Sequence, residues 1–185
     1  MPATVRISYY GASPGEPVGF NAETGIVLSQ SDAQVPAPGV APVDIPLSIG
    51  TNFSWIMLLA LQVTVGSTTH ISNRKISFGT VPAVPAGSDI FWADQPTYRD
   101  PALGNKPPDI ANPGPDTPAP TGAGAPAAYA AITTALQIFD VTSVATNAPG
   151  RNGDFVEIVG AVDNTYQGGP GQETFPSVII TYDEA

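Results

Sequence analysis

The sequence has no cysteine, only six lysine and arginine residues, and a single histidine among its 185 residues. The lack of cysteine excludes disulfides and thiolate metal sites. The formal net charge of −10 argues against direct nucleic-acid binding, because phosphate contacts need clustered lysine and arginine side chains. Charged residues make up 12% of the chain, about half of the usual share. We interpret this low charge as a sign that partners cover much of the surface.

Two kinds of apolar segment are also missing. The N-terminal residues Met1–Arg6 lack the apolar core of a signal peptide, so we expect synthesis in a cytoplasm without export by a cleaved signal. The main apolar run, which starts at Trp55, is far shorter than the roughly 20 residues that a membrane-spanning helix needs. We therefore expect no membrane insertion.

Proline and glycine are abundant instead, with 21 and 19 residues. Proline removes a backbone donor and glycine costs entropy in a helix, so the chain cannot be mostly helical. The hydrophobic fraction of 42% is enough for one sizeable core. This composition predicts an all-β protein. We expect one domain over residues 1–185, an antiparallel β-sandwich or jelly roll with long Pro/Gly-rich loops and at most one short helix.

The segment Ser54–Phe78 is predicted to form a long β-hairpin at the centre of the fold. It consists of two runs rich in β-branched and aromatic residues, separated by a Gly-Ser-Thr-Thr cluster. In the first run the odd-numbered positions are apolar throughout, whereas the even-numbered positions are apolar only up to Ala60. Ile56 and Leu58 therefore need a second cover, which either a loop of the same chain or another subunit could provide.

Further elements follow from the same kind of pattern. Ala127–Leu136 is the one credible helix, with Pro126 suited to its first turn, although this segment could equally run into a strand at Ile138–Phe139. The other predicted strands are Val5–Tyr10, Thr24–Leu28, Asp89–Ala93, Asp154–Asp163 and Ser177–Tyr182.

Two proline-rich segments interrupt these strands. Residues 30–50 are predicted to form an extended arm, because proline prevents continuous pairing in a sheet. Residues 94–126 have almost no hydrophobic pattern, and their proline content favours an extended or polyproline-like chain. A structureless loop of this length is uncommon inside a compact domain. It is therefore either a mobile linker or a segment that lies on a neighbour.

Candidates for catalysis are few. His70 lies beside the predicted hairpin turn, and the chain contains no Gly-x-Ser-x-Gly nucleophile elbow. Glu157 lies in the middle of a predicted strand and could point into a groove as a glycosidase carboxylate. The simpler interpretation, which we favour, is that it pairs with Arg74 or Lys75 on a sheet face. We therefore expect no catalytic residues and no cofactor.

Two places in the sequence could bind a ligand. A loop formed by Asp163, Asn164 and Glu173 could hold calcium, but its spacing is not that of an EF-hand, and we predict no metal site. Trp55 and Trp92 could stack on a sugar. Both lie within apolar strand runs, so core packing is the favoured interpretation.

Three stretches resemble the small virion structural proteins of tailed bacteriophages. They are Phe53-Ser54-Trp55 leading into Leu59–Thr64, then Thr69–Ile76, and Val162–Tyr166 through Thr181–Glu184. The resemblance implies a non-enzymatic β-sandwich or jelly roll in the virion that decorates or stabilises the capsid by bridging subunits. It also implies the major capsid protein or other virion subunits as partners, and a homo-oligomer, with a trimer as the expected number. Under this hypothesis the candidate partner-interface residues are Ile56, Leu58, Arg74, Lys75, Trp92 and Tyr98.

Two alternatives from other classes remain open. A carbohydrate-binding module of a phage tail or baseplate would need Trp92 or Tyr98 to be exposed beside a carboxylate. A glycosidase-like hydrolase would need two carboxylates about 5 to 9 Å apart in one cleft.

Overall fold

The computed structural model describes residues 4–10, 20–21, 51–54, 57–65, 71–79, 85–95, 97–98, 130–131, 137–139, 150–168 and 178–184, and the structural statements below concern these residues. Every regular element among them is a β-strand, which confirms the predicted all-β class. The strands are β1 (Thr4–Tyr10), β2 (Phe20–Asn21), β3 (Thr51–Phe53), β4 (Met57–Val65), β5 (Ile71–Phe78), β6 (Ser88–Gln95), β7 (Ala130–Ala131), β8 (Gln137–Phe139), β9 (Gly150–Asp163) and β10 (Val178–Glu184). The described part of the chain contains no helix long and apolar enough to cross a membrane.

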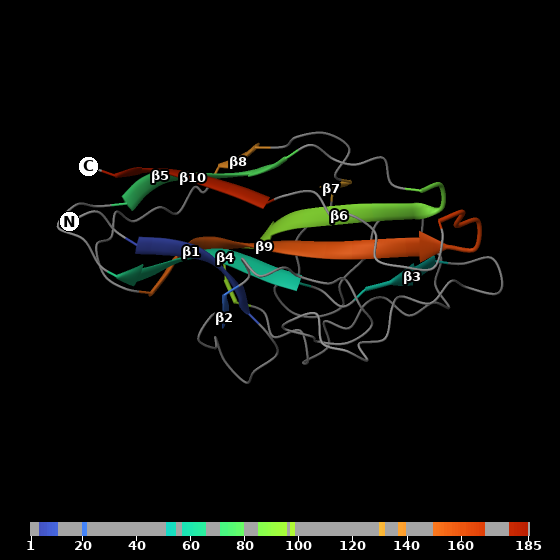
Figure 1. Ribbon diagram of the computed structural model, residues 1–185, viewed down its shortest axis with the longest axis horizontal. Coiled ribbons are helices and arrows are strands. Elements are labelled where there is room, and N and C mark those ends of the chain that lie inside the picture. The colour runs from blue at the N-terminus through green and yellow to red at the C-terminus, as the bar shows by residue number, and fades with distance from the viewer. Residues whose placement is uncertain are drawn as a thin grey trace.

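The strands form two antiparallel sheets (Figure 1). The larger sheet has seven strands in the order β2-β1-β4-β9-β6-β7, and β3 also pairs with β9. The smaller sheet has the order β10-β5-β8. At 14 residues, β9 is the longest strand, and it pairs with β3 and β4 on one edge and with β6 on the other. It is therefore the strand around which the larger sheet is assembled.

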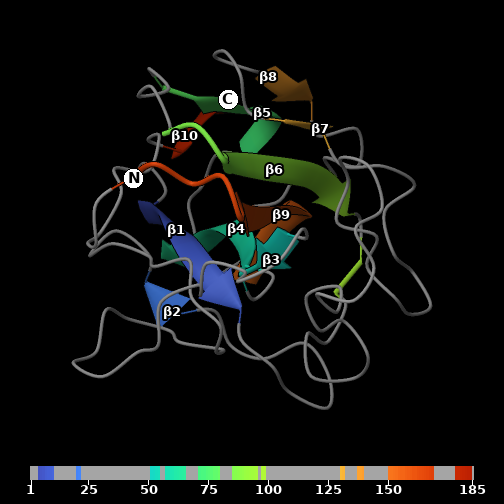
Figure 2. The ribbon, with the colours of Figure 1, turned by 90° about the vertical axis from the view of Figure 1, so that its right-hand side faces the viewer.

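The smaller sheet lies over one face of the larger one, as both views show (Figures 1 and 2). Tyr182 of β10 packs against Leu61 and Val63 of β4 and thus joins the layers. Within the smaller sheet, the register places Ile180, Ile76 and Ile138 in a single row across its three strands.

The predicted hairpin over Ser54–Phe78 is wrong in its pairing, although both of its strands exist. β4 pairs with β1 on one edge and with β9 on the other, whereas β5 belongs to the smaller sheet between β10 and β8. Since both edges of β4 are occupied, β5 has no place beside it. The chain therefore changes sheets between Val65 and Ile71.

The second cover predicted for the even-numbered face of β4 comes from the same chain. Leu58 and Ala60 are fully buried in a cluster with Tyr10 of β1 and Phe155 of β9, and Tyr98 packs against this cluster. The opposite face of β4 is equally buried, because Met57, Leu59, Leu61 and Val63 are at most 4% exposed. β4 is thus a central strand with core on both sides. Ile56 lies outside the described residues.

β3 and β4 both pair with the same edge of β9. Phe53 pairs with Ala161 and Met57 with Ile158. At this point the backbone N–H of Ser54 donates to the Gly160 carbonyl at 2.8 Å, and the Ser54 hydroxyl accepts from the Gly160 N–H at 2.8 Å. The serine hydroxyl therefore serves as an acceptor for a backbone N–H at the end of β3.

Of the other predicted elements, most strands are confirmed and the helix is wrong where it can be compared with the structure. The strands expected from Val5, Asp89 and Asp154 are present as β1, β6 and β9, and that expected from Ser177 is present as β10 from Val178 onward. The predicted helix is wrong at Ala130–Ala131, which form β7 and pair with Trp92 and Phe91 of β6. The alternative strand at Ile138–Phe139 is confirmed as part of β8. The predicted strand 24–28, the arm at 30–50 and most of the loop at 94–126 lie outside the described residues.

Candidate interaction surface

A polar row crosses the face of the larger sheet that points away from the smaller sheet. Arg6 of β1 is the register partner of Gln62 of β4, and Gln62 is the partner of Arg151 of β9. The row continues the face on which Leu58 and Ala60 lie, because residues two apart in a strand share a face. Two of the six cations of the chain are therefore placed in one line across three strands.

Gln62 is the acceptor at the centre of this row. Arg6 Nε and Nη2 donate to Gln62 Oε1 at 3.0 and 2.7 Å, and the Ser8 hydroxyl donates to the same oxygen at 2.7 Å. Arg6 Nε also approaches Ser8 Oγ at 3.1 Å. Ser8 is fully buried, whereas Arg6 and Gln62 are half-buried. These bonds fix the arginine against the sheet.

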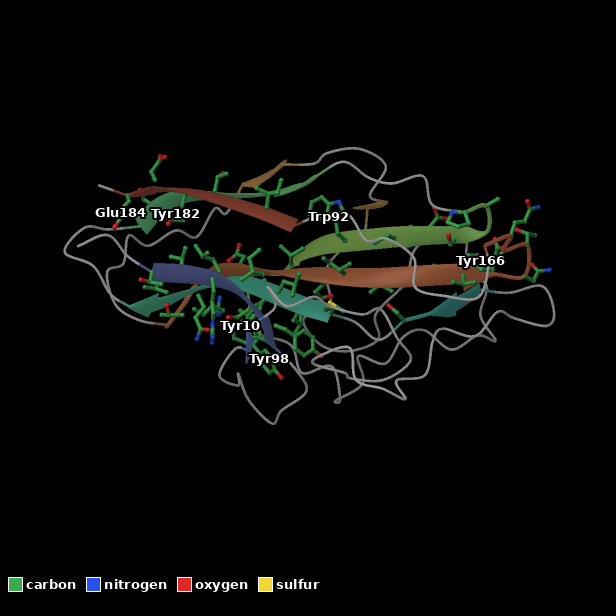
Figure 3. All side chains as sticks on the ribbon, viewed as in Figure 1. Tyr10, Trp92, Tyr98, Tyr166, Tyr182 and Glu184 are labelled. Atoms are coloured by element: carbon green, nitrogen blue, oxygen red, sulfur yellow. The ribbon has the colours of Figure 1, made fainter. Side chains whose placement is uncertain are left out.

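An aromatic cluster adjoins the row. The Arg151 guanidinium lies over the Phe155 ring at 4.3 Å from the centroid, a cation–π contact, and Arg151 Nη1 also donates to the Gly153 carbonyl. Tyr10 meets Phe155 edge-on at 5.1 Å between centroids, and Tyr98 lies 6.0 Å from the same ring. Figure 3 shows Tyr10 and Tyr98 together on this side of the sheet. Phe155 thus links the cationic row to the apolar core of this face.

This face combines guanidinium groups with aromatic rings. Guanidinium groups donate paired hydrogen bonds to planar anionic groups, and half-buried aromatic rings such as that of Tyr98 supply apolar contact. The row and the cluster also join three strands, so they have a structural role whether or not a partner binds.

Two carboxylates of β9 are buried. Glu157 is fully buried and Asp154 is 6% exposed. They are three residues apart in β9, and Asp154 lies within an irregularity of the pairing with β4, where Leu59 pairs with Val156 and Leu61 with Asn152. Glu157 is the register partner of Leu58, on the face turned away from β5. The side chains of Arg74 and Lys75 lie outside the described part of the structure, so the ion pair with Glu157 stays a prediction.

The start of the loop considered as a calcium site forms a hydrogen-bonded corner. Asp163 Oδ1 accepts from the backbone N–H and the hydroxyl of Thr165, both at 2.6 Å. The corner packs against the turn before β6, where the Asp163 N–H donates to the Gly87 carbonyl at 2.8 Å. Among the described residues no group of three or more metal-ligating side chains is gathered. Glu173 lies outside the described residues.

The predicted partner-interface residues lie at separate places. Leu58 and Tyr98 share the aromatic cluster, but Leu58 has no exposed surface, so a partner could not contact it without opening the sheet. Trp92 is half-buried on β6, opposite Ile158, and extends toward the smaller sheet (Figure 3). Arg74 and Lys75 belong to β5, where Lys75 is the register partner of Thr181. Ile56 and His70 lie outside the described residues.

Sequence reasoning missed the polar row and the exposed edge of β10. Arg6, Gln62 and Arg151 are far apart in the sequence, and only the pairing of β1 and β9 with β4 brings them together. Gln62 did stand out as the first polar residue on its face of β4, which was the one local signal. Ile179 gave no local signal in the sequence, because its exposure follows from the position of β10 in the smaller sheet.

Comparison with known proteins finds no match: no protein-family model, no curated protein and no solved structure is similar to this chain. The resemblance to phage virion proteins therefore stays a prediction.

Proposed function

We propose that this chain is a non-enzymatic virion structural protein with a β-sandwich or jelly-roll fold, which decorates or stabilises a phage capsid by bridging its subunits. The observation that carries the proposal is that several polar side chains hydrogen-bond within the protein. Gln62 with Arg6, Ser54 with Gly160, and Asp163 with Thr165 each hold strands or turns together. Such a framework suits a rigid binding module.

The packing of the two sheets supports the sandwich part of the proposal. The contact of Tyr182 with Leu61 and Val63 provides an interior between the layers. The second core, around Phe155 and Tyr98, lies on the far side of the larger sheet. A module with core on both faces of its main sheet is stiff, and stiffness reduces the entropy lost when it docks.

The proposed mechanism is burial of capsid surface. The protein would sit over junctions between major capsid proteins, with its proline-rich segments on neighbouring subunits and with Arg74, Lys75, Trp92 and Tyr98 at the contacts. Each Å² of apolar surface covered would contribute about 25 cal/mol before association costs. Stability of the shell should therefore increase with occupancy.

The deciding experiment is fractionation of intact particles, followed by separation of heads from tails. We expect the protein on heads, and we expect heads that lack it to release their contents at a lower temperature. Adding back the purified chain should raise the release temperature to that of heads that contain the protein. Recovery of the protein only as a free monomer would contradict the proposal, whereas recovery on tails together with glycan binding would favour the carbohydrate-binding module.

A matched pair of variants tests the contact residues. The double variant Arg74→Glu/Lys75→Glu should bind heads at least about tenfold more weakly, which corresponds to about 1.4 kcal/mol. Asn164→Ala, at an exposed turn position, should bind like the unmodified chain. Equal binding of both variants would remove Arg74 and Lys75 from the proposed interface. Cleavage of cell-wall glycans by the purified chain would instead support the hydrolase.

A further inference from the structure

The strand β10 is the edge of the smaller sheet. In the order β10-β5-β8, it is paired with β5 alone within the part of the chain that the structure describes. The ladder runs regularly from Val178 opposite Phe78 to Thr181 opposite Lys75, and a register shift follows between Thr181 and Asp183. Natural proteins protect such edges with proline, lysine or bulges. The first half of β10 has none of these, and its sequence Val-Ile-Ile-Thr favours pairing.

Most of the described side chains of β10 are exposed. Tyr182 faces inward and packs on β4, whereas Ile179, Thr181 and Asp183 are exposed. Ile179 is 44% exposed and is the one large hydrophobic side chain that the described residues leave at the surface. The apolar exposure is thus located on the same short segment as the unprotected edge.

The charges on β10 restrict how a partner strand can lie. Asp183 and Glu184 are both exposed at the C-terminal end, and the N-terminal half is uncharged. A second β10 in parallel orientation would place these carboxylates beside their counterparts, which is unfavourable. In antiparallel orientation, each acidic end extends past the uncharged start of the other strand. The like charges are then at opposite ends of the pair.

We propose that two copies of this chain associate through antiparallel pairing of their β10 strands near Ile180, about a two-fold axis. The pairing joins the two small sheets into one continuous sheet, and the same strand of each copy fills the edge of the other. It also brings Ile179 of each copy to a diagonal position across the new ladder, where the two side chains cover each other. This inference concerns self-association and does not depend on the proposed virion role.

The first test measures mass against concentration with the full chain, by sedimentation or by light scattering. We expect a concentration-dependent dimer. Ile179→Lys should weaken it by roughly tenfold or more, because a charge on an edge strand opposes strand addition. Asn164→Lys introduces the same charge at a distant exposed turn and should dimerise normally. A chain that is monomeric throughout, or an oligomer indifferent to Ile179→Lys, would overturn the proposal.

The second test measures the orientation of the strands. Because the chain contains no cysteine, a nitroxide can be attached at one position in the variant Glu184→Cys and the distance between copies measured by electron paramagnetic resonance. Antiparallel pairing centred on Ile180 separates the two Glu184 Cα atoms by about 27 Å, whereas parallel pairing brings them to about 5 Å. A distance near the longer value supports the proposal, and the shorter value overturns it. Unchanged strand content by circular dichroism would show that each variant is folded.

Discussion

Gln62 illustrates how one uncharged side chain can organise a sheet. Its Oε1 accepts hydrogen bonds from Arg6 and from the buried Ser8, and both donors come from the neighbouring strand. Removing the acceptor leaves these donors to be satisfied in a site where water has limited access. An unsatisfied buried donor is more costly than the net value of the bond that it loses.

We expect Gln62→Leu to lower the free energy of unfolding by about 1–3 kcal/mol, because it removes the acceptor of the buried Ser8 hydroxyl and of the half-buried Arg6. Gln62→Glu keeps an acceptor in the same place and adds a charge-assisted bond to Arg6, so it should be close to neutral or stabilising. Chemical denaturation of the two variants measures the difference. Equal losses for both would show that the polar row contributes no hydrogen-bond energy.

Gly87 has a different kind of constraint. Its φ is +82°, and a Cβ atom there would lie 2.4 Å from the Tyr166 backbone nitrogen and 2.7 Å from Asp163 Oδ1. Glycine is needed both for the backbone conformation and for the close approach of the two turns.

Gly87→Ala should therefore destabilise the protein by about 1–3 kcal/mol from backbone strain alone, with the steric clash in addition. Gly150→Ala is the matched control, since Gly150 also has a positive φ, +139°, but no atom within 4 Å of the added Cβ. The midpoint temperature of thermal unfolding should be lower for Gly87→Ala than for Gly150→Ala. The reverse order would mean that the corner between the two turns is not closely packed.

At the scale of elements, β4 is the strand whose role changed most between expectation and structure. Its alternating pattern suggested one buried face, with a second cover needed only for Ile56 and Leu58. Its position between β1 and β9 gives it two cores, so Leu58 is 0% exposed and Leu59 1%. The two leucines belong to separate interiors on opposite sides of the same sheet.

This arrangement predicts that Leu58→Ala and Leu59→Ala cost similar amounts, each about 2–5 kcal/mol. Ile179→Ala, on an exposed position of β10, should change the stability of the monomer by less than about 0.5 kcal/mol. Urea denaturation at low protein concentration gives all three values. A loss confined to Leu59→Ala would indicate that the face of Leu58 has no real core.

At the scale of the whole molecule, the two sheets are joined where Tyr182 contacts β4. Val5, Leu61 and Val63 belong to the larger sheet, and Tyr182 is the residue of β10 that packs with them. The sheets can unfold as one unit only if such contacts couple them.

We expect Tyr182→Ala to weaken this coupling, lowering the free energy of unfolding by about 1–3 kcal/mol, less than for a fully buried aromatic residue. In the unmodified chain, amide exchange in β5 and in β9 should have similar free energies of opening. In Tyr182→Ala, β5 should exchange through a separate, easier opening. Unchanged protection of β5 would show that other contacts hold the layers together.

The local sequence was sufficient to predict where most strands lie. β1, β6, β9 and β10 each carry alternating or β-branched runs bounded by turn residues, and these signals are properties of the segment itself. The all-β class followed from the proline and glycine content for the same reason. The helix predicted at Ala127–Leu136 is wrong at Ala130–Ala131, which pair with β6. Alanine favours a helix, but tertiary pairing outweighs this intrinsic propensity.

Only the tertiary structure decided which strands pair and which residues meet. β4 and β5 are adjacent in sequence, and a hairpin was the simplest local solution, yet their edges are filled by β1, β9, β10 and β8. The row of Arg6, Gln62 and Arg151 and the exposed edge at Ile179 both follow from those choices of partner. Side-chain alternation is encoded within each strand, whereas strand order depends on contacts between segments far apart in the chain, and a single sequence carries no local signal for it.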